Sequence, residues 1–331
     1  MIKCPFPPRL CILATALLAV PFEAAALITP AGTAANTSSD ATFAPTSIWN
    51  NVGGAGDSTG EYLGNGWIIT ANHVSRTNAT TINFSLTLGN QSYGWIGTGA
   101  QLGSHDIFLA HLAPDTNGNL PDAYGATGVA LTSFTPPTTT AATLIANGRT
   151  ISATNYYLVS GNTWTPVPQG TPGAYPVYSW GPSHLKTWGT NKIWGTTAAG
   201  STIGGSPLSA FTVVGDDALA TDFSNGPSAT HDPATADETG AALNDSGGGM
   251  FVQEGGVWKL AGILDSTDAY VGQPASTTTD GNDTLAIDLS SYASQINAVI
   301  AVPEPASGAL LGIAGTVFAA SVRRRKKSRA D

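Results

Sequence analysis

The chain has 331 residues and a formal net charge of −9. Between its two ends, residues 27–301 carry five basic and 19 acidic side chains, a net charge of −14. So acidic a surface repels phosphate backbones, which excludes nucleic acid as a partner. Both cysteines, Cys4 and Cys11, lie near the N-terminus, so the rest of the chain forms no disulfide.

Residues 1–26 have the three parts of a secretory signal peptide. The segment contains two basic residues, residues 10–22 are mostly apolar, and Ala24-Ala25-Ala26 offers a small-residue cleavage site. A transmembrane anchor is the alternative, but the apolar run is shorter than the roughly 20 residues that a span needs. The following residues 27–44 are rich in Ala, Thr and Ser, and we expect them to form a flexible leader.

Short β-type runs fill the middle of the chain and alternate with Gly, Asn, Pro and Thr. The sequence predicts strands at residues 66–70, 81–88, 92–99, 106–112, 142–147, 155–160, 209–214 and 218–223. It also predicts a hairpin within 252–264 and a helix at 291–300, capped by Ser290 or Ser291. Many short strands with one short C-terminal helix indicate the all-β class.

Three segments carry side chains that together suit nucleophilic catalysis. GWIITANHV is a β-rich run that leads into His73, SHDIFLAHL places Asp106 at the head of an apolar run, and NDSGG is a tight turn around Ser246. A serine hydroxyl is a poor nucleophile until a base removes its proton, and a neutral imidazole near pH 7 can do so. The chain therefore offers a nucleophile, a base and a carboxylate that orients the base.

In this order, the three segments resemble those of the chymotrypsin/trypsin family of serine proteases. That family carries Gly-Trp-Val-Leu-Thr-Ala-Ala-His-type, Asp-Ile-Ala-Leu-Leu-type and Gly-Asp-Ser-Gly-Gly-type blocks. The resemblance implies a protease domain over residues 45–301, made of two six-stranded antiparallel β-barrels at about 45–131 and 144–290. The Pro/Thr-rich run 132–143 would connect the barrels, and the active site would lie in the cleft between them.

The resemblance also assigns roles to single residues. His73 would act as acid and base, Asp106 would orient it, and Ser246 would be the nucleophile. The backbone N–H groups of Asn244 and Ser246 would form the oxyanion hole. The family normally has glycine at position 244, although asparagine tolerates a positive φ better than most residues.

The specificity pocket is expected to take a small or apolar side chain. Gly240 stands six residues before the serine, where trypsin-like members carry an aspartate, so it supplies no charge for Lys or Arg. Asp237 and Glu238 would change this expectation if their loop folded inward.

Three further features depart from the family pattern or lie outside it. No Arg-Ile-Val-Gly-Gly-type activation site precedes the first barrel. In the family, cleavage at that site frees an N-terminus that pairs with the aspartate beside the serine, here Asp245. Either Asp245 has another partner in this chain, or the site is permanently assembled. Asp265 replaces a small polar residue and would alter the electrostatics around the catalytic pair. Asp280-Gly281-Asn282-Asp283 is rich in oxygen ligands but lacks the full spacing of a calcium loop, so a plain turn is predicted.

The C-terminal end has three parts. Val302-Pro303-Glu304-Pro305 is followed by the uncharged run 306–322 and then by RRRKKSR, a pattern that fits a short span with a cytoplasmic basic tail. Residues 302–331 resemble the Pro-Glu-Pro (PEP-CTERM) sorting signal of Gram-negative bacteria. The resemblance implies an exosortase as partner, transient anchoring in the inner membrane, and export to the cell surface or medium. A permanent single-span anchor is the alternative.

Together these patterns predict an exported serine endopeptidase that forms an acyl-enzyme on Ser246. We expect a monomer that acts on protein or peptide substrates and needs no metal or other cofactor. The alternative is a catalytically inactive relative that serves as a cell-surface or matrix adhesion module. An esterase of the α/β-hydrolase fold fits poorly, because Asn244 stands where that motif has glycine and the triad order differs.

Overall fold

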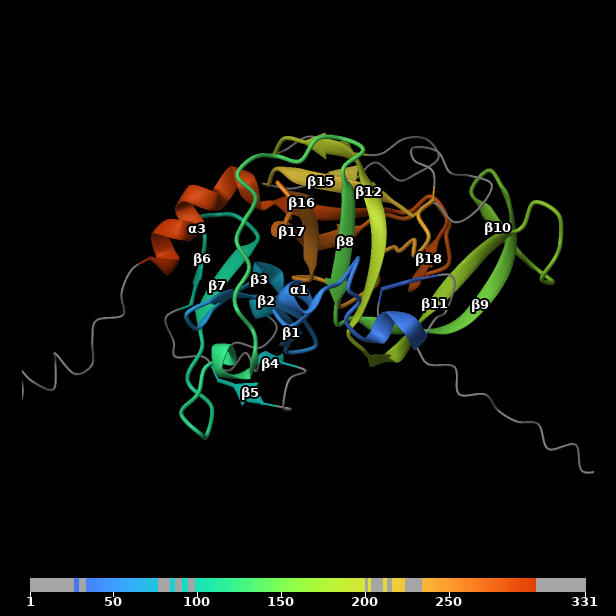
Figure 1. The fold of residues 1–331 in the computed structure, drawn as a ribbon. Coiled ribbons are helices and arrows are strands. Elements are labelled where there is room, and N and C mark those ends of the chain that lie inside the picture. Colours follow the sequence, from blue (N-terminus) through green and yellow to red (C-terminus); the bar gives the residue numbers. More distant parts are fainter. Residues whose placement is uncertain are drawn as a thin grey trace, which may run out of the picture.

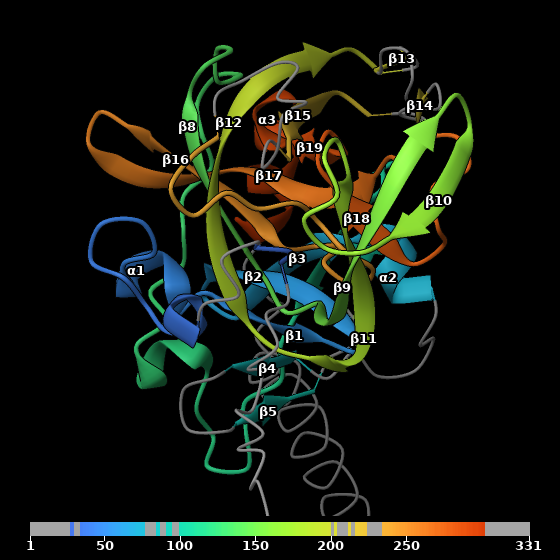
Figure 2. The same cartoon turned by 90° about the vertical axis from the view of Figure 1, so that its right-hand side faces the viewer.

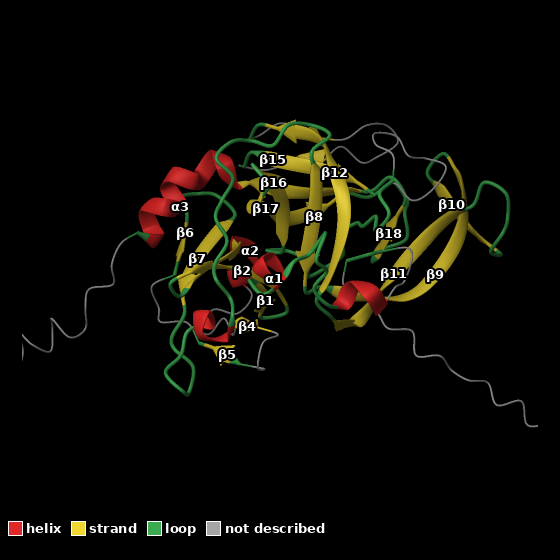
Figure 3. Ribbon diagram, in the orientation of Figure 1, coloured by secondary structure: helices red, strands yellow, loops and turns green. Residues whose placement is uncertain are grey.

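The molecule is built mostly from β-strands, which confirms the all-β prediction (Figure 3). The computed structural model describes residues 27–29, 34–76, 84–86, 91–94, 99–199, 202–203, 211–212, 216–223 and 234–301. The predicted signal peptide at 1–26 and the predicted sorting signal at 302–331, with its membrane segment 306–322, lie outside these residues. No helix within the described ranges has the length and apolar character needed to cross a membrane.

The first half of the molecule is one antiparallel sheet of seven strands in the order β5-β4-β1-β2-β3-β7-β6 (Figure 1). Its strands are β1 (Val52–Ala55), β2 (Ser58–Gly64), β3 (Trp67–Ala71), β4 (Phe84–Leu86), β5 (Ser92–Tyr93), β6 (Ala100–Gln101) and β7 (Ile107–His111). The predicted six-stranded barrel at 45–131 is therefore corrected to a seven-stranded sheet. In the part of the chain that the structure describes, the edge strands β5 and β6 have two residues each and do not pair with each other.

The second half contains a closed six-stranded barrel, as predicted, in the order β12-β15-β19-β17-β16-β8. Its strands are β8 (Ala141–Ala146), β12 (Thr187–Thr197), β15 (Ala218–Asp222), β16 (Gly249–Glu254), β17 (Val257–Thr267) and β19 (Asp283–Asp288). Small and aliphatic side chains alternate inward along these strands and fill the barrel: Ala142, Leu144, Ile193, Leu219, Met250, Ala261 and Ala286.

A second sheet stands out from this barrel at the end opposite the C-terminal helix (Figures 1 and 2). It has the order β10-β9-β11-β18 and comprises β9 (Arg149–Ser160), β10 (Thr163–Val167), β11 (Tyr175–His184) and β18 (Thr277–Thr279). A short pair, β13 (Thr202–Ile203) and β14 (Phe211–Thr212), lies apart from it. The sequence predicted only part of β9 here, because Pro and Gly interrupt the apolar pattern of the other strands.

The N-terminal segment is packed, so the prediction of a flexible leader at 27–44 is wrong for its described residues. Leu27 and Ile28 are fully buried. Ile28 exchanges two backbone hydrogen bonds with Gly240, at 2.9 and 3.1 Å, and the Leu27 N–H donates to Thr187 Oγ1 at 2.9 Å. Two adjacent large aliphatic side chains drive this burial, although the composition around them is polar and small.

Helices are few and short. The structure has α1 (Thr46–Trp49), α2 (Asn72–Arg76), α3 (Ala293–Ile300) and three 3₁₀ turns, η1 (Ala34–Thr37), η2 (Pro121–Tyr124) and η3 (Leu289–Tyr292). Together η3 and α3 form the predicted C-terminal helix, but the side chain of Asp288 caps η3 by accepting the N–H of Ser290 at 3.0 Å. One apolar core runs from α3 across both halves and includes Ile69, Ile107, Phe251, Ile263 and Ile296.

Candidate active site

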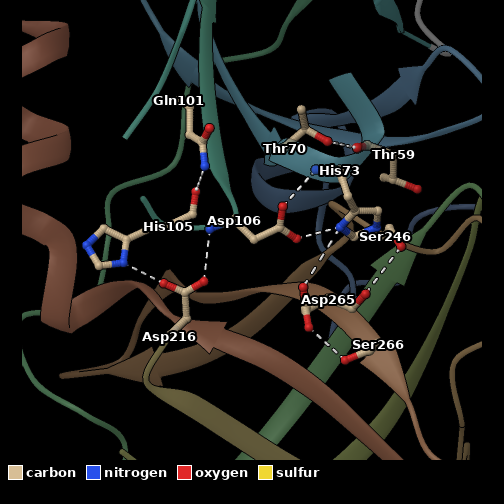
Figure 4. Close-up of polar contacts among 10 residues, drawn as sticks. All are labelled: Thr59, Thr70, His73, Gln101, His105, Asp106, Asp216, Ser246, Asp265 and Ser266. Atoms are coloured by element: carbon tan, nitrogen blue, oxygen red, sulfur yellow. Dashed lines mark hydrogen bonds and ion pairs between the residues drawn. The ribbon is translucent and has the colours of Figure 1, made fainter. Parts of the chain in front are cut away.

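The ends of two neighbouring strands bring His73 and Asp106 together. In the β3–β7 pair, Ala71 lies opposite Ile107, so the residues just beyond both positions are neighbours. The His73 N–H donates to Asp106 Oδ1 at 2.7 Å, and His73 Nδ1 lies 2.5 Å from Asp106 Oδ2 (Figure 4). The carboxylate thus holds both the main chain and the ring of the histidine.

A third residue, which the sequence analysis missed, holds this carboxylate in place. Asp216 Oδ2 accepts the backbone N–H of Asp106 at 2.9 Å, while its Oδ1 lies 2.6 Å from His105 Nδ1. Gln101 Nε2 donates to the His105 carbonyl at 2.8 Å. Asp216 lies just before β15 and more than 100 positions away in the chain, so no local pattern points to it.

Ser246 sits in the turn before β16, and this turn leans against the first sheet. The Ser246 carbonyl accepts the Thr59 N–H at 3.1 Å, and Thr70 Oγ1 donates to the Thr59 carbonyl at 2.6 Å. A Cβ at Gly247, where φ is +80°, would lie 2.2 Å from Thr59 O and from Thr70 Oγ1. Only glycine therefore allows the serine turn to approach β2 and β3 this closely.

Asp265 on β17 is the fourth polar side chain of the site. Its Oδ1 lies 3.9 Å from His73 Nδ1, and its carbonyl accepts the Ser246 hydroxyl at 3.4 Å (Figure 4). Burial and a hydrogen bond with Asp106 raise the pKa of Asp265 to about 6. Burial opposes ionisation of Asp106 as well, but hydrogen bonds from His73 and Asp265 outweigh it and lower the pKa of Asp106 below its usual value.

The same three groups have the size of a metal site. Polar atoms of His73, Asp106 and Asp265 all lie within 4.8 Å of one another. One ring nitrogen, His73 Nδ1, is however already in close contact with Asp106. The arrangement therefore fits a hydrogen-bonded base and its orienting acid better than a metal centre.

Asn244 has a left-handed backbone conformation in the turn before Ser246. Its φ is +75°, in the left-handed region that favours glycine, and its side-chain Oδ1 accepts Arg149 Nε at 3.0 Å. No hydrogen bond among the described residues uses the N–H of Asn244 or that of Ser246. The assignment of these two N–H groups to an oxyanion hole stays a prediction.

Gly240 is buried beneath the N-terminal segment. A Cβ at this position would meet the side chains of Phe223 at 3.0 Å and Thr278 at 3.1 Å, so a larger residue requires these side chains to shift. The carboxylate of Glu238 accepts the N–H and hydroxyl of Thr235 in its own loop, at 2.8 and 2.9 Å. Gly240 as a pocket residue therefore stays a prediction, and the Glu238 carboxylate is engaged within its own loop.

Asp245, next to the serine, is fully enclosed. Its Oδ2 accepts the Ala242 N–H at 2.6 Å, and burial raises the pKa of its carboxyl well above the usual range. Among the ion pairs of the described residues, none includes Asp245. Backbone donors rather than a cation thus hold this carboxyl in the structure.

The segment Asp280–Asp283 forms a turn that leads into β19. The Asn282 N–H donates to the Thr279 carbonyl at 3.0 Å, and Gly281 has φ +83°. Beside this turn two buried carboxyls lie near each other. Burial raises the pKa of Asp268 to about 7 and, with the neighbouring charge of Asp268, the pKa of Asp283 to about 8.

Comparison with known proteins identifies one sequence motif. Residues 301–326 match the PEP-CTERM protein-sorting motif, which confirms the predicted sorting signal and implies recognition by an exosortase and export in a Gram-negative bacterium. No curated protein matches the chain in sequence. A matching solved structure is neuropsin, a serine protease expressed in the limbic system of mouse brain, with 16% identity, a TM-score of 0.40, and coverage of 74% of this chain and 89% of that one.

Proposed function

We propose that this protein is an exported serine-type endopeptidase with Ser246 as nucleophile, His73 as acid and base, and Asp106 as orienter. The observation that carries the proposal is the double hydrogen bond of Asp106 to the main chain and ring of His73, beside a serine in a glycine-held turn. A carboxylate that fixes both the backbone and the ring of a histidine is typical of an oriented catalytic base rather than of a structural histidine.

The chemistry follows from these positions. His73 takes the proton of Ser246 Oγ as this oxygen attacks the carbonyl carbon of a peptide, and Asp106 keeps the Nδ1 proton in place and stabilises the imidazolium. The N–H groups of Asn244 and Ser246 stabilise the oxyanion that forms. His73 then gives its proton to the departing amine, which leaves an ester on Ser246. Water, activated by the same histidine, hydrolyses this ester and restores the serine.

The proposed substrate is a protein or peptide, and the expected side chain before the cleaved bond is small or apolar. Gly240 brings no charge, and Glu238 is bound to Thr235 within its own loop. The sorting motif supports action outside the cytoplasm, either at the cell surface or after release. The proposed enzyme acts as a monomer and needs no cofactor.

Peptide cleavage tests this proposal. The exported protein is incubated with a mixed peptide library, and the products are identified by mass spectrometry beside those of the Ser246→Ala variant. We expect new peptide termini with the unchanged protein and none with the variant. Cleavage that persists in the variant would assign the activity elsewhere. A folded protein that cleaves nothing would favour the adhesion module, for which the sorting motif is the supporting observation.

A further inference from the structure

A second carboxylate lies beside the histidine of the proposed triad. Asp106 Oδ2 forms the 2.5 Å contact with His73 Nδ1, and Asp265 Oδ1 lies 3.9 Å from the same nitrogen. Asp265 comes from β17 of the barrel, whereas His73 on α2 and Asp106 just before β7 belong to the first half of the molecule. The base is therefore flanked by acids from both halves of the molecule.

Asp265 is held in this position on both sides. Ser266 Oγ donates to its Oδ2 at 2.7 Å, and its carbonyl accepts the Ser246 hydroxyl at 3.4 Å. Its side chain is only 22% exposed. One residue thus contacts the nucleophile through its main chain and lies near the base through its side chain.

The charged surroundings of Asp265 come from two segments. The titratable groups facing it within the described residues are His73 on α2 and Asp106 just before β7. Behind Asp106, the pair of His105 and Asp216 binds the Asp106 backbone. No lysine or arginine among the described residues forms an ion pair with Asp265. Its charge therefore acts mainly on the histidine and on the other carboxylate.

We infer that Asp265 is a positioning residue that sets the pH range in which His73 works as a base, an inference that rests on the proposed function. When protonated, Asp265 donates a hydrogen bond to Asp106, and a single negative charge faces the imidazole. When ionised, it adds a second negative charge 3.9 Å from His73 Nδ1. This charge favours the imidazolium, so less of the histidine is neutral and able to accept a proton. Acylation then begins at a higher pH than it would if Asp106 were the only carboxylate beside His73.

The pKa of Asp265 agrees with this role. Burial and the hydrogen bond to Asp106 raise it to about 6. Unperturbed histidine has a pKa of about 6.5, so both groups change charge in the same range. Because the three groups interact, they titrate as one coupled system rather than one after another.

The test compares the pH dependence of Ser246 labelling by a fluorophosphonate in the exported protein and in its Asp265→Asn and Asp265→Ser variants. Both variants keep a hydrogen-bond donor and remove the charge. The labelling rate falls as the pH is lowered, and this fall is the acidic limb of the pH profile. We expect the limb to shift to lower pH by about one unit in the variants, which makes labelling near pH 5.5 up to about tenfold faster. The Asp217→Asn variant, whose carboxylate instead accepts the Ala199 N–H, is the control and keeps the original limb. A limb that stays in place in both variants would overturn the inference.

A second readout separates this inference from the proposed function. The His73 imidazole is titrated by NMR in Ser246→Ala protein, with and without Asp265→Asn, and its signals are assigned by their loss in His73→Gln. We expect the Asp265→Asn protein to titrate about one pH unit lower. A lower midpoint without any labelling would keep the role of Asp265 and contradict the proposed function. Labelling of Ser246 whose pH dependence, like the His73 midpoint, is unchanged by Asp265→Asn would keep the proposed function and contradict the role of Asp265.

Discussion

The two halves of the proposed site are assembled in different ways. His73 and Asp106 follow and precede strands that pair directly, so the register of β3 and β7 alone makes them neighbours. The serine turn depends on the other half of the molecule, since Thr59 of the first sheet donates its N–H to the Ser246 carbonyl at 3.1 Å. The comparison teaches that strand pairing brings the base and its acid together, whereas the contact between the two halves places the nucleophile.

The largest effect is expected where the serine turn meets the first sheet. In Gly247→Ala, the new Cβ would lie 2.2 Å from Thr59 O and Thr70 Oγ1 at a positive φ, so the turn must move away. A displacement of about 1 Å typically costs about 100-fold in rate, and we expect fluorophosphonate labelling of Ser246 to fall by at least that factor.

The matched control is Gly255→Ala in the exposed hairpin turn. Its φ is +60°, but no atom lies within 4 Å of the added Cβ. Its labelling rate should stay close to that of the unchanged protein, with a stability loss of about 1–2 kcal/mol for the left-handed conformation. Equal loss of labelling in the two variants would show that the strained left-handed backbone of the alanine explains the loss. The close approach of the serine turn to the first sheet would then not be its cause.

Buried hydrogen bonds of Lys186 also join the halves, and removing them should destabilise the protein. Glu61 on β2 is completely buried, and the nearby Lys186 donates to the carbonyls of Trp49 and Val52 at 2.8 and 3.0 Å. Burial raises the pKa of Glu61 and lowers the pKa of Lys186 to about 7. Replacing Lys186 by Met leaves the carbonyls of Trp49 and Val52 without this donor, and a buried acceptor left unsatisfied typically costs about 1–3 kcal/mol in the free energy of unfolding.

Chemical denaturation measures this loss, and the double variant Glu61→Leu/Lys186→Met provides the control. The double variant also removes the buried Glu61 carboxyl, whose oxygens have no hydrogen-bond partner among the described residues, so it should recover part of the stability. If Lys186→Met alone is as stable as the unchanged protein, the hydrogen bonds of Lys186 do not hold the halves together.

Asp216 tests whether local pairing is sufficient for the His73–Asp106 half. Asp216→Asn weakens the hydrogen bond that the Asp106 N–H donates to residue 216, and it removes the charge that faces His105. Since a charge-assisted hydrogen bond is worth about 1.5–3 kcal/mol, we expect labelling of Ser246 to slow by roughly tenfold. Asp217→Asn, at the next position, should label normally. A normal rate for Asp216→Asn would mean that the strand register suffices.

The smallest effect concerns the pH dependence of stability in the barrel. The folded protein keeps protons on Asp268 and Asp283, with pKa values of about 7 and 8, whereas an unfolded aspartate loses its proton near a pKa of about 3.9. The folded state therefore binds more protons between these values, and this contribution to stability is full below about pH 4 and is lost as the pH rises towards 8.

Thermal unfolding at several pH values measures this contribution. In Asp268→Asn/Asp283→Asn, the decline in Tm between pH 5 and 8 should be a few degrees smaller than in the unchanged protein, because the titrating carboxyls are gone. Parallel curves for the two proteins would contradict the raised pKa values.

The sequence predicted the elements whose signals are local. The apolar run into His73, the run after Asp106 and the glycine-flanked turn at Ser246 each specify their own strand or turn. By contrast, Asp216 and Thr59 act through contacts made only in the folded chain. The buried Leu27-Ile28 pair was missed because the polar composition around it outweighed two aliphatic residues, and the first half was predicted as a barrel because strand number and closure depend on long-range pairing.

The most direct test of the account is covalent labelling of Ser246. The exported protein and its His73→Ala variant are treated with a fluorophosphonate, and the modified peptide is identified by mass spectrometry. The account predicts one adduct, on Ser246, in the unchanged protein and its loss in the variant, because only an activated serine attacks the reagent. A folded protein without an adduct, or an adduct that persists without His73, would contradict it.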